Sequence, residues 1–162
     1  MTPRLSLAGG LRLRSSHGAA FVELAVSLLV IVMVLVGTTD FARVYHHVID
    51  LENAARAGAQ FGATSLANSN DTAGMAAAAV AAAPDTPLTA VASNACVCAS
   101  DDGSTTLRSV PCDDSCPEGA TPEEHLVVMV TVNASYTFRT FAKVAPIPSN
   151  FTLTRTATLR AQ

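Results

Sequence analysis

The chain has 162 residues, 49% of them hydrophobic and only 14% charged, and its formal net charge at pH 7 is −3. This length allows one membrane span and one small domain but excludes two domains, and the slightly acidic balance argues against nucleic acid as a partner. The apolar composition is typical of a chain that lies partly in lipid.

A long apolar segment near the N-terminus is preceded by charges of one sign. Arg4, Arg12 and Arg14 come before it, and no acidic residue lies among them. The segment, residues 19–37, is long enough to cross the hydrocarbon core of a bilayer as an α-helix. Because cytoplasmic flanks carry the excess of Lys and Arg, we expect the N-terminus to stay cytoplasmic and everything after Gly37 to be exported.

Two other kinds of N-terminal segment compete with this interpretation. A secretory signal peptide has an apolar core of about 7–15 residues and a small-x-small cleavage site, whereas this run is longer and residues 34–37 offer no good site. A plain signal anchor stays open as an alternative. Glu23 is the unusual residue here, because an ionised side chain in a membrane helix costs about 2.5–3.5 kcal/mol at its centre and less near an end. Glu23 is therefore a candidate functional residue.

The helical pattern continues beyond the apolar segment, from Thr38 to Gly62. Asp40 with Arg43, and Glu52 with Arg56, are spaced to pair on the outside of a helix. We therefore expect one long helix of about 40 residues, with small residues at its far end that let another backbone approach closely. Its apolar face is predicted to comprise Phe41, Val44, Val48, Leu51, Ala55, Gly58 and Gly62.

A turn and a second, shorter helix are predicted next. Asn68 to Asp71 has turn composition, and Asp71 with Thr72 stands where an N-cap belongs, ahead of an alanine run that Pro84 stops. An unstructured Ala-rich linker is the alternative.

From Leu88 onward the hydrophobic period changes to two, which indicates strands. The clearest strand is residues 126–138, and residues 151–159 repeat the pattern with Arg155 as a misfit on the apolar face. Residues 88–98 form a weaker strand and residues 105–110 a short one. The predicted fold is α+β, with a long N-terminal helix, a short second helix and a small antiparallel sheet of three to four strands. The apolar face of the clearest strand comprises Leu126, Val128, Val130, Val132, Ala134, Tyr136 and Phe138.

The four cysteines form two close pairs, Cys96 with Cys98 and Cys112 with Cys116. Outside the cytoplasm disulfides persist, and the Cys96-x-Cys98 spacing is too tight for a structural zinc site. A bond between Cys96 and Cys98 would be strained. We therefore expect disulfides between the two pairs that staple a hairpin, and favour the nested arrangement of Cys98–Cys112 inside Cys96–Cys116.

No set of residues suits catalysis. The histidines are His17, His46, His47 and His125, and none has a plausible nucleophile near it in the sequence. His46 and His47 are adjacent, so on a helix they point about 100° apart and make a poor pair of metal ligands. We expect no enzymatic activity, no cofactor and no bound metal.

Several motifs of the N-terminal half resemble those of a known family. Gly18 to Glu23 resembles the processing site of type IV prepilins, and the chain looks most like the TadE-like family of Tad/Flp pilus assembly. It has "GAAFVELA" from Gly18, "DFAR" from Asp40 and "NAARAGAQ" from Asn53. The later strands, the proline-containing connection between them and the paired cysteines also fit. Leu29 stands where the family commonly has proline.

The resemblance implies a function and a processing step. A membrane prepilin peptidase would cut between Gly18 and Ala19, and Glu23 would meet the new N-terminal ammonium of a neighbouring subunit. The protein would be a pseudopilin or minor pilin-like component of Tad/Flp pilus assembly, in contact with other Tad pilins or pseudopilins. It would be a single-pass protein of the bacterial inner membrane, with its C-terminal domain periplasmic or extracellular.

This interpretation divides the chain into four parts. Residues 1–18 are a basic leader, 19–39 a transmembrane helix, 40–66 its exposed continuation, and 67–162 an exported α+β pilin-like domain. One alternative is a signal-anchored exported domain that binds a ligand through the cysteine hairpin and has no pilus role. Another is a metal-binding redox module with free thiols.

Overall fold

The computed structural model describes residues 16–100, 108–112, 116, 124–141 and 148–161. The expected leader lies outside these residues except for its last three. By the contacts within it, the chain divides into two compact units, Met1–Thr38 and Thr39–Gln162.

Helix α1 runs from Ser16 to Ala63 without interruption, which confirms the predicted long helix. Its part in the first unit consists mainly of Ala, Val and Leu, and the helix continues through Leu29 and Gly37. The most apolar 18-residue stretch of this helix has a mean hydropathy of 2.8, and none of it is buried inside the protein. By length and composition, it is the one helix among the described residues that could cross a membrane.

Two predicted ion pairs on α1 are confirmed. Arg43 Nη1 lies 3.2 Å from Asp40 Oδ1, and Arg56 Nη2 lies 2.8 Å from Glu52 Oε1. The prediction for Phe41 is wrong, because its side chain is 73% exposed. Arg43, which is not part of the predicted packed face, contacts the sheet instead. Its guanidinium carbon lies 5.0 Å from the centre of the Phe138 ring.

Two short helices follow α1. Helix α2, Leu66–Asn70, occupies the place of the expected turn, and Ser65 caps it by accepting a hydrogen bond from the Asn68 N–H. Helix α3, Thr72–Ala81, is the predicted second helix. The Asp71 carboxylate accepts from the Gly74 N–H at 2.8 Å, so Asp71 is the N-cap that the sequence indicated.

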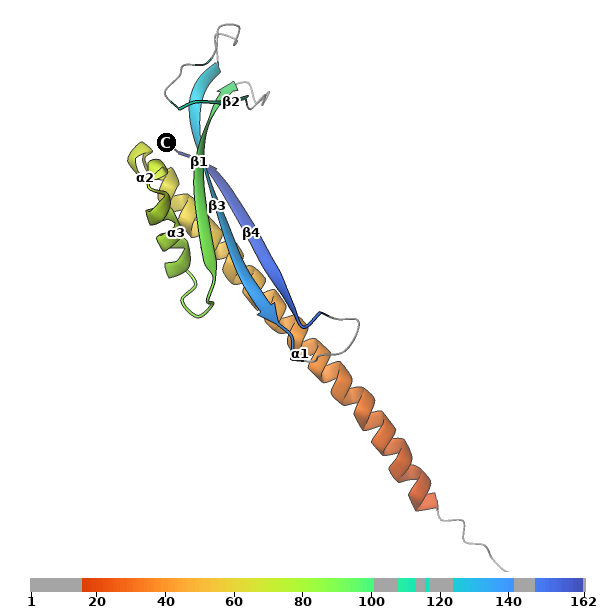
Figure 1. Ribbon diagram of the computed structural model, residues 1–162. Coiled ribbons are helices and arrows are strands. Elements are labelled where there is room, and N and C mark those ends of the chain that lie inside the picture. The colour runs from red at the N-terminus through yellow and green to blue at the C-terminus, as the bar shows by residue number, and fades with distance from the viewer. Residues whose placement is uncertain (1–15, 101–107, 113–115, 117–123, 142–147, 162) are drawn as a thin grey trace, which may run out of the picture. The chain divides into compact units, whose positions relative to one another are not determined.

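The sheet has four antiparallel strands in the order β2-β1-β3-β4. Strand β1 is Thr89–Ser100, β2 is Arg108–Val110, β3 is Glu124–Arg139 and β4 is Asn150–Arg160. The two long central strands pair from Thr89↔Ser135 to Ser100↔Glu124. Figure 1 shows helices α2 and α3 on the same side of the sheet as α1. The predicted α+β fold is confirmed.

The core lies between the helices and one face of the sheet. One cluster joins Leu51, Ala54 and Ala55 of α1 to Ala134 of β3. A second joins Ala59 of α1 and Met75 and Ala79 of α3 to Val130 and Val132 of β3. The buried positions of β3 alternate from Val130 to Phe138, as the period of two predicted.

At the start of β3 the buried positions shift from even-numbered to odd-numbered residues. Leu126 is 37% exposed whereas Val127 is only 4% exposed. Val127 pairs with Val97 of β1, which is also buried, and Cys98 lies opposite Leu126. Both faces of the sheet are therefore partly covered here, which a strict period of two does not describe.

Candidate functional site

Gly18 and Ala19, the residues of the expected cleavage site, lie in the first turn of α1 and are exposed. A Cβ built on Gly18 would meet no atom within 4 Å. Packing against the described residues therefore does not require glycine at this position.

Glu23 lies one helical turn beyond Ala19, on the same face of α1. It is exposed, and its neighbours along the helix are apolar and exposed as well. Among the described residues, no charged side chain pairs with Glu23. The carboxylate is thus placed in an apolar segment with no partner from the described part of its own chain.

The "DFAR" segment joins α1 to the end of β3 within the second unit. Both carboxylate oxygens of Asp40 accept hydrogen bonds from the Phe141 N–H, at 3.2 and 3.0 Å. The guanidinium carbon of Arg43 lies 4.1 Å from the centre of the Phe141 ring. Asp40 also pairs with Arg43, so one carboxylate and one guanidinium hold this end of the sheet against the helix.

The "NAARAGAQ" segment supplies much of the contact between α1 and α3. A Cβ on Gly58 would lie 2.6 Å from the backbone oxygen of Met75, and one on Gly62 would lie 2.3 Å from the Met75 sulfur. Ala54, Ala55 and Ala59 are fully buried. The predicted close approach of another backbone is confirmed, and the approaching backbone is that of α3.

The four cysteines form two disulfides between the pairs, as expected, but the nested arrangement is wrong. Cys96 is bonded to Cys112, with Cα atoms 5.1 Å apart, and Cys98 to Cys116, with Cα atoms 5.8 Å apart. The bonds therefore cross in sequence instead of one enclosing the other.

The register of the hairpin explains this connectivity. Cys96 lies opposite Val110 of β2, and Cys98 lies opposite Arg108. Cys112 follows Val110 by two residues, so along the ladder it is nearer to Cys96 than to Cys98. Cys98 then bonds to Cys116, the one cysteine that remains.

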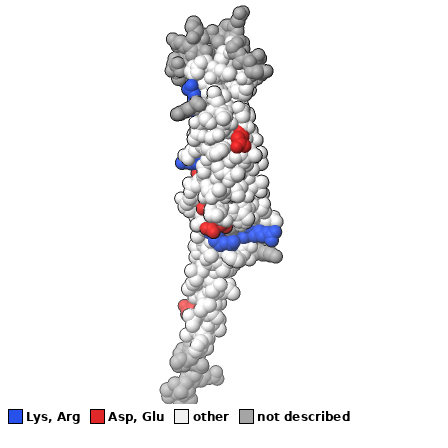
Figure 2. Space-filling view, turned by 90° about the vertical axis from the view of Figure 1, so that its left-hand side faces the viewer, with Lys and Arg blue, Asp and Glu red and all other residues white. Residues whose placement is uncertain are grey.

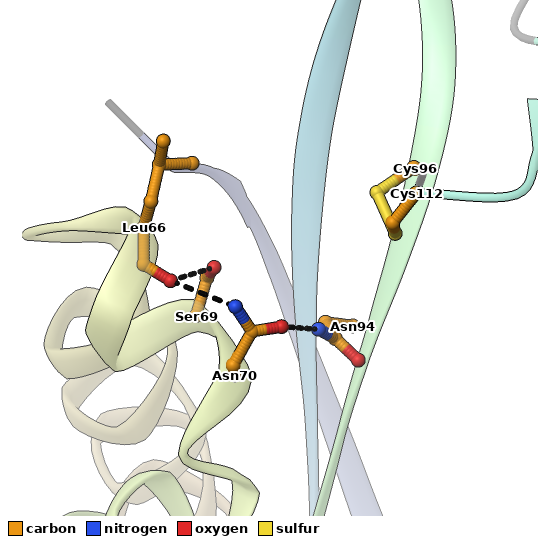
Figure 3. The surroundings of a disulfide bond; sticks show 6 residues. All are labelled: Leu66, Ser69, Asn70, Asn94, Cys96 and Cys112. Atoms are coloured by element: carbon orange, nitrogen blue, oxygen red, sulfur yellow. Dashed lines mark hydrogen bonds between the residues drawn. A yellow bond between two sulfur atoms is a disulfide. The ribbon is translucent and has the colours of Figure 1, made fainter. Parts of the chain in front are cut away.

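Helix α2 is fastened to β1 close to the first disulfide (Figure 3). The Asn94 amide donates to the Asn70 carbonyl oxygen at 2.9 Å, and the Asn70 amide donates to the Leu66 backbone oxygen at 3.1 Å. Asn94 precedes Cys96 by two residues on the same face of β1. The disulfides and this amide contact therefore stabilise the same end of the sheet.

His46, His47 and Asp50 lie close together on α1, although the two imidazole planes are 82° apart. One ligand atom from each of the three residues lies within 4.8 Å of the others. Asp50 follows His46 by four residues and His47 by three, so it lies on the helix face between them. Thr86, which sequence reasoning missed, donates its hydroxyl hydrogen to Asp50 Oδ2 at 2.8 Å.

The surroundings of His47 favour its neutral form. Burial lowers the pKa of the His47 imidazole, Asp50 opposes this shift, and His46 and Arg43 reinforce it. The ring lies 4.5 Å from that of Tyr136 and 5.9 Å from that of Phe138, measured between centres.

Charged side chains are few and scattered on the face shown in Figure 2. The Lys and Arg side chains there form separate groups, one of them a row across the molecule, and no continuous basic stripe runs along the described residues on this face. A stripe of that kind is the usual footprint of a nucleic-acid-binding surface.

Comparison with known proteins identifies one part of the chain. Residues 18–60 match the family model of the TadE-like protein. No curated protein and no solved structure matches the chain. The matched segment holds Gly18, Glu23, Asp40 and Arg43 together with the buried alanines of α1. Residues 18–60 therefore carry a TadE-like domain, and the family that the sequence motifs indicated is confirmed for this segment.

Proposed function

We propose that this protein is a pseudopilin or minor pilin-like component of Tad/Flp pilus assembly, anchored by the N-terminal half of α1. The TadE-like domain supports the coarser assignment, a component associated with the Tad pilus. The finer role includes cleavage between Gly18 and Ala19 by a prepilin peptidase. It also includes contact of the shortened helix with other Tad pilins or pseudopilins in the inner membrane.

The observation that carries the proposal is the position of Glu23. It is an exposed carboxylate in an apolar helix, without a charged partner in the described part of its own chain. Burying an unpaired carboxylate in lipid costs several kcal/mol, which an opposite charge offsets. Cleavage after Gly18 would create an ammonium on Ala19, and the ammonium of a neighbouring subunit would supply that charge.

The surroundings of Gly18 are compatible with recognition by a peptidase. Proteolysis needs an accessible backbone, and Gly18 is exposed. Glycine also lowers helix stability by about 1 kcal/mol relative to alanine. Because no described residue packs against Gly18, recognition by an enzyme would explain a glycine at this position.

Two variants test the proposal in the native host. Gly18→Leu is expected to block cleavage, so that the protein keeps its leader and pili are lost. Gly37→Leu is the matched control for cleavage, because a Cβ there also meets nothing within 4 Å. Processing is read from the intact mass, and pili are counted by electron microscopy.

Glu23→Gln separates cleavage from assembly. We expect normal cleavage but a large loss of pili, because the amide cannot pair with an ammonium as a carboxylate does. Glu52→Gln is the control for charge removal, since Glu52 lies outside the apolar segment and pairs with Arg56. Normal cleavage of Gly18→Leu together with normal pili for Glu23→Gln would contradict the proposal and favour a signal-anchored binding domain.

The proposed topology has its own test. The N-terminus is placed in the cytoplasm and residues after Thr38 on the outer side of the inner membrane. Protease added to spheroplasts is therefore expected to degrade the second unit. Protection of that unit would contradict the topology.

A further inference from the structure

A polar cluster in the second unit has the donor atoms of a metal site. His46, His47 and Asp50 come from α1, and Thr86 comes from the connection between α3 and β1. His46 Nδ1 lies 3.0 Å from Asp50 Oδ2, and His47 Nδ1 lies 3.3 Å from Thr86 Oγ1. The three residues that could bind an ion each offer one ligand atom within 4.8 Å of the others.

Contacts with the rest of the fold hold two of the three ligands in place. The His47 ring packs against Tyr136 and Phe138, and the Asp50 carboxylate accepts a hydrogen bond from Thr86. The side chain of Asp50 is 23% exposed and that of His46 is 72% exposed. The cluster therefore has a fixed inner side and an open outer side, where His46 is free to adjust.

The donor set matches the preferences of one class of ion. Neutral imidazole and carboxylate suit zinc and neighbouring first-row transition metals. Zinc ligands lie about 2.0–2.1 Å from the ion, so ligand atoms of a tetrahedral site are about 3.3 Å apart. Closing the cluster to that spacing requires a shift of about 1–1.5 Å, which the exposed imidazole of His46 has room to make.

The charges around the cluster do not oppose a cation strongly. The guanidinium of Arg43 acts electrostatically on His47, and Asp40 pairs with this guanidinium at 3.2 Å. Asp50 supplies the negative charge.

From this geometry we infer that His46, His47 and Asp50 form a binding site for a divalent transition-metal ion, for which zinc is the appropriate probe. The three side chains occupy three positions of a tetrahedral site, and water takes the fourth. The ion replaces the direct contact between His46 and Asp50. The inference does not depend on leader cleavage or on a role in the pilus.

The test uses the full chain, purified in detergent without a histidine tag and without reductant, so that the cysteines stay in their disulfides. After treatment with a chelator, zinc chloride is titrated and heat is measured by calorimetry. We expect one ion per chain. His46→Gln and Asp50→Asn are each expected to weaken binding at least tenfold, because each removes one of three ligands.

The controls are His125→Gln, in β3, and His17→Gln, near the start of the sequence; both are expected to leave affinity unchanged. A second readout is thermal unfolding, since an ion that binds only the folded state raises its midpoint. Zinc should raise the midpoint of the unaltered chain and of His125→Gln but not of His46→Gln. Absence of saturable binding to the unaltered chain, or equal weakening by the control variants, would overturn the inference.

Discussion

The glycines of α1 fall into two pairs with opposite surroundings. A Cβ on Gly18 or Gly37, in the first unit, would meet nothing within 4 Å. A Cβ on Gly58 or Gly62, in the second unit, would overlap atoms of Met75. One half of the helix therefore uses glycine for packing inside the chain, and the other half does not.

The same contrast holds for the apolar side chains. In the first unit Phe21 is 71% exposed and Leu29 is 62% exposed, whereas in the second unit Leu51 is fully buried. Exposed apolar surface of this extent marks contact with a membrane or a partner. Residues 18–38 of α1 therefore expose their apolar side chains, as a candidate membrane anchor does, whereas residues 39–63 bury theirs against the domain that follows them.

Removal of a disulfide is the variant with the largest expected effect, and it should act on the second unit alone. Cys96→Ser combined with Cys112→Ser is expected to lower the free energy of unfolding by about 2–4 kcal/mol. The loss is measured by thermal unfolding, in which the resistance of the second unit to protease is recorded at each temperature. Ser109→Ala, on the neighbouring strand β2, is the control. Unchanged stability of the double variant would contradict the role given to the bond.

Alanine at the packed glycines tests the contrast directly. Gly58→Ala is expected to cost about 1–3 kcal/mol, because the new methyl group meets the rigid backbone at Met75. The better helix propensity of alanine offsets up to about 1 kcal/mol of this cost. Gly62→Ala should cost less, since the side chain of Met75 is flexible.

Gly37→Ala is the matched control from the first unit, and it should not lower the unfolding midpoint. Thermal unfolding by circular dichroism in detergent provides the comparison. If Gly37→Ala and Gly58→Ala were equally damaging, the two halves of α1 would not differ as described.

The Asp40 contact is expected to have a smaller effect. Asp40→Ala removes the acceptor of the Phe141 N–H and the partner of Arg43, and should cost about 1 kcal/mol. Glu52→Ala, which breaks an exposed pair on the same helix, should cost no more than about 0.5 kcal/mol. Hydrogen exchange at the end of β3 should rise only for Asp40→Ala. Equal exchange in both variants would contradict the proposed tie between α1 and β3.

The smallest expected effect is a pH dependence due to His47. Because burial lowers its pKa in the folded state, the unfolded state binds a proton first as the pH falls. Stability is therefore retained above the unfolded pKa of about 6.5 and decreases below it. The loss continues down to the lower folded pKa. Asp50, His46 and Arg43 are the charged groups that act on this imidazole.

In His47→Gln, stability should decrease less steeply as the pH falls from 6.5 to the folded pKa of His47. This expectation holds whatever the effect of the substitution on stability at pH 8. Thermal unfolding midpoints across pH 5 to 8 measure it, with His125→Gln as the control. An equal pH dependence with and without His47 would contradict the assignment.

Local patterns in the sequence predicted the helices and strands well. The long apolar and amphipathic run predicted α1, Asp71 predicted the start of α3, and the period of two predicted β3. These features depend on backbone periodicity and capping, which act over a few residues. The motifs from Gly18 to Gln60 likewise indicated the family before any comparison.

Features that depend on distant residues could not be predicted. The disulfide connectivity follows from the register of β1 and β2, which four cysteines alone do not determine. The exposure of Phe41 depends on which face of α1 packs against the sheet, where Arg43 lies near Phe138 of β3. The polar cluster includes Thr86, which tertiary packing brings to Asp50 from 36 residues away in the sequence, so local spacing on the helix did not reveal it.

The most direct test of the central claim is the intact mass of the protein isolated from membranes of its native host. The account predicts a mass reduced by residues 1–18, with Ala19 as the new N-terminus. A full-length mass, with the leader still attached, would contradict prepilin processing. It would leave Glu23 without a partner and favour a signal-anchored binding domain.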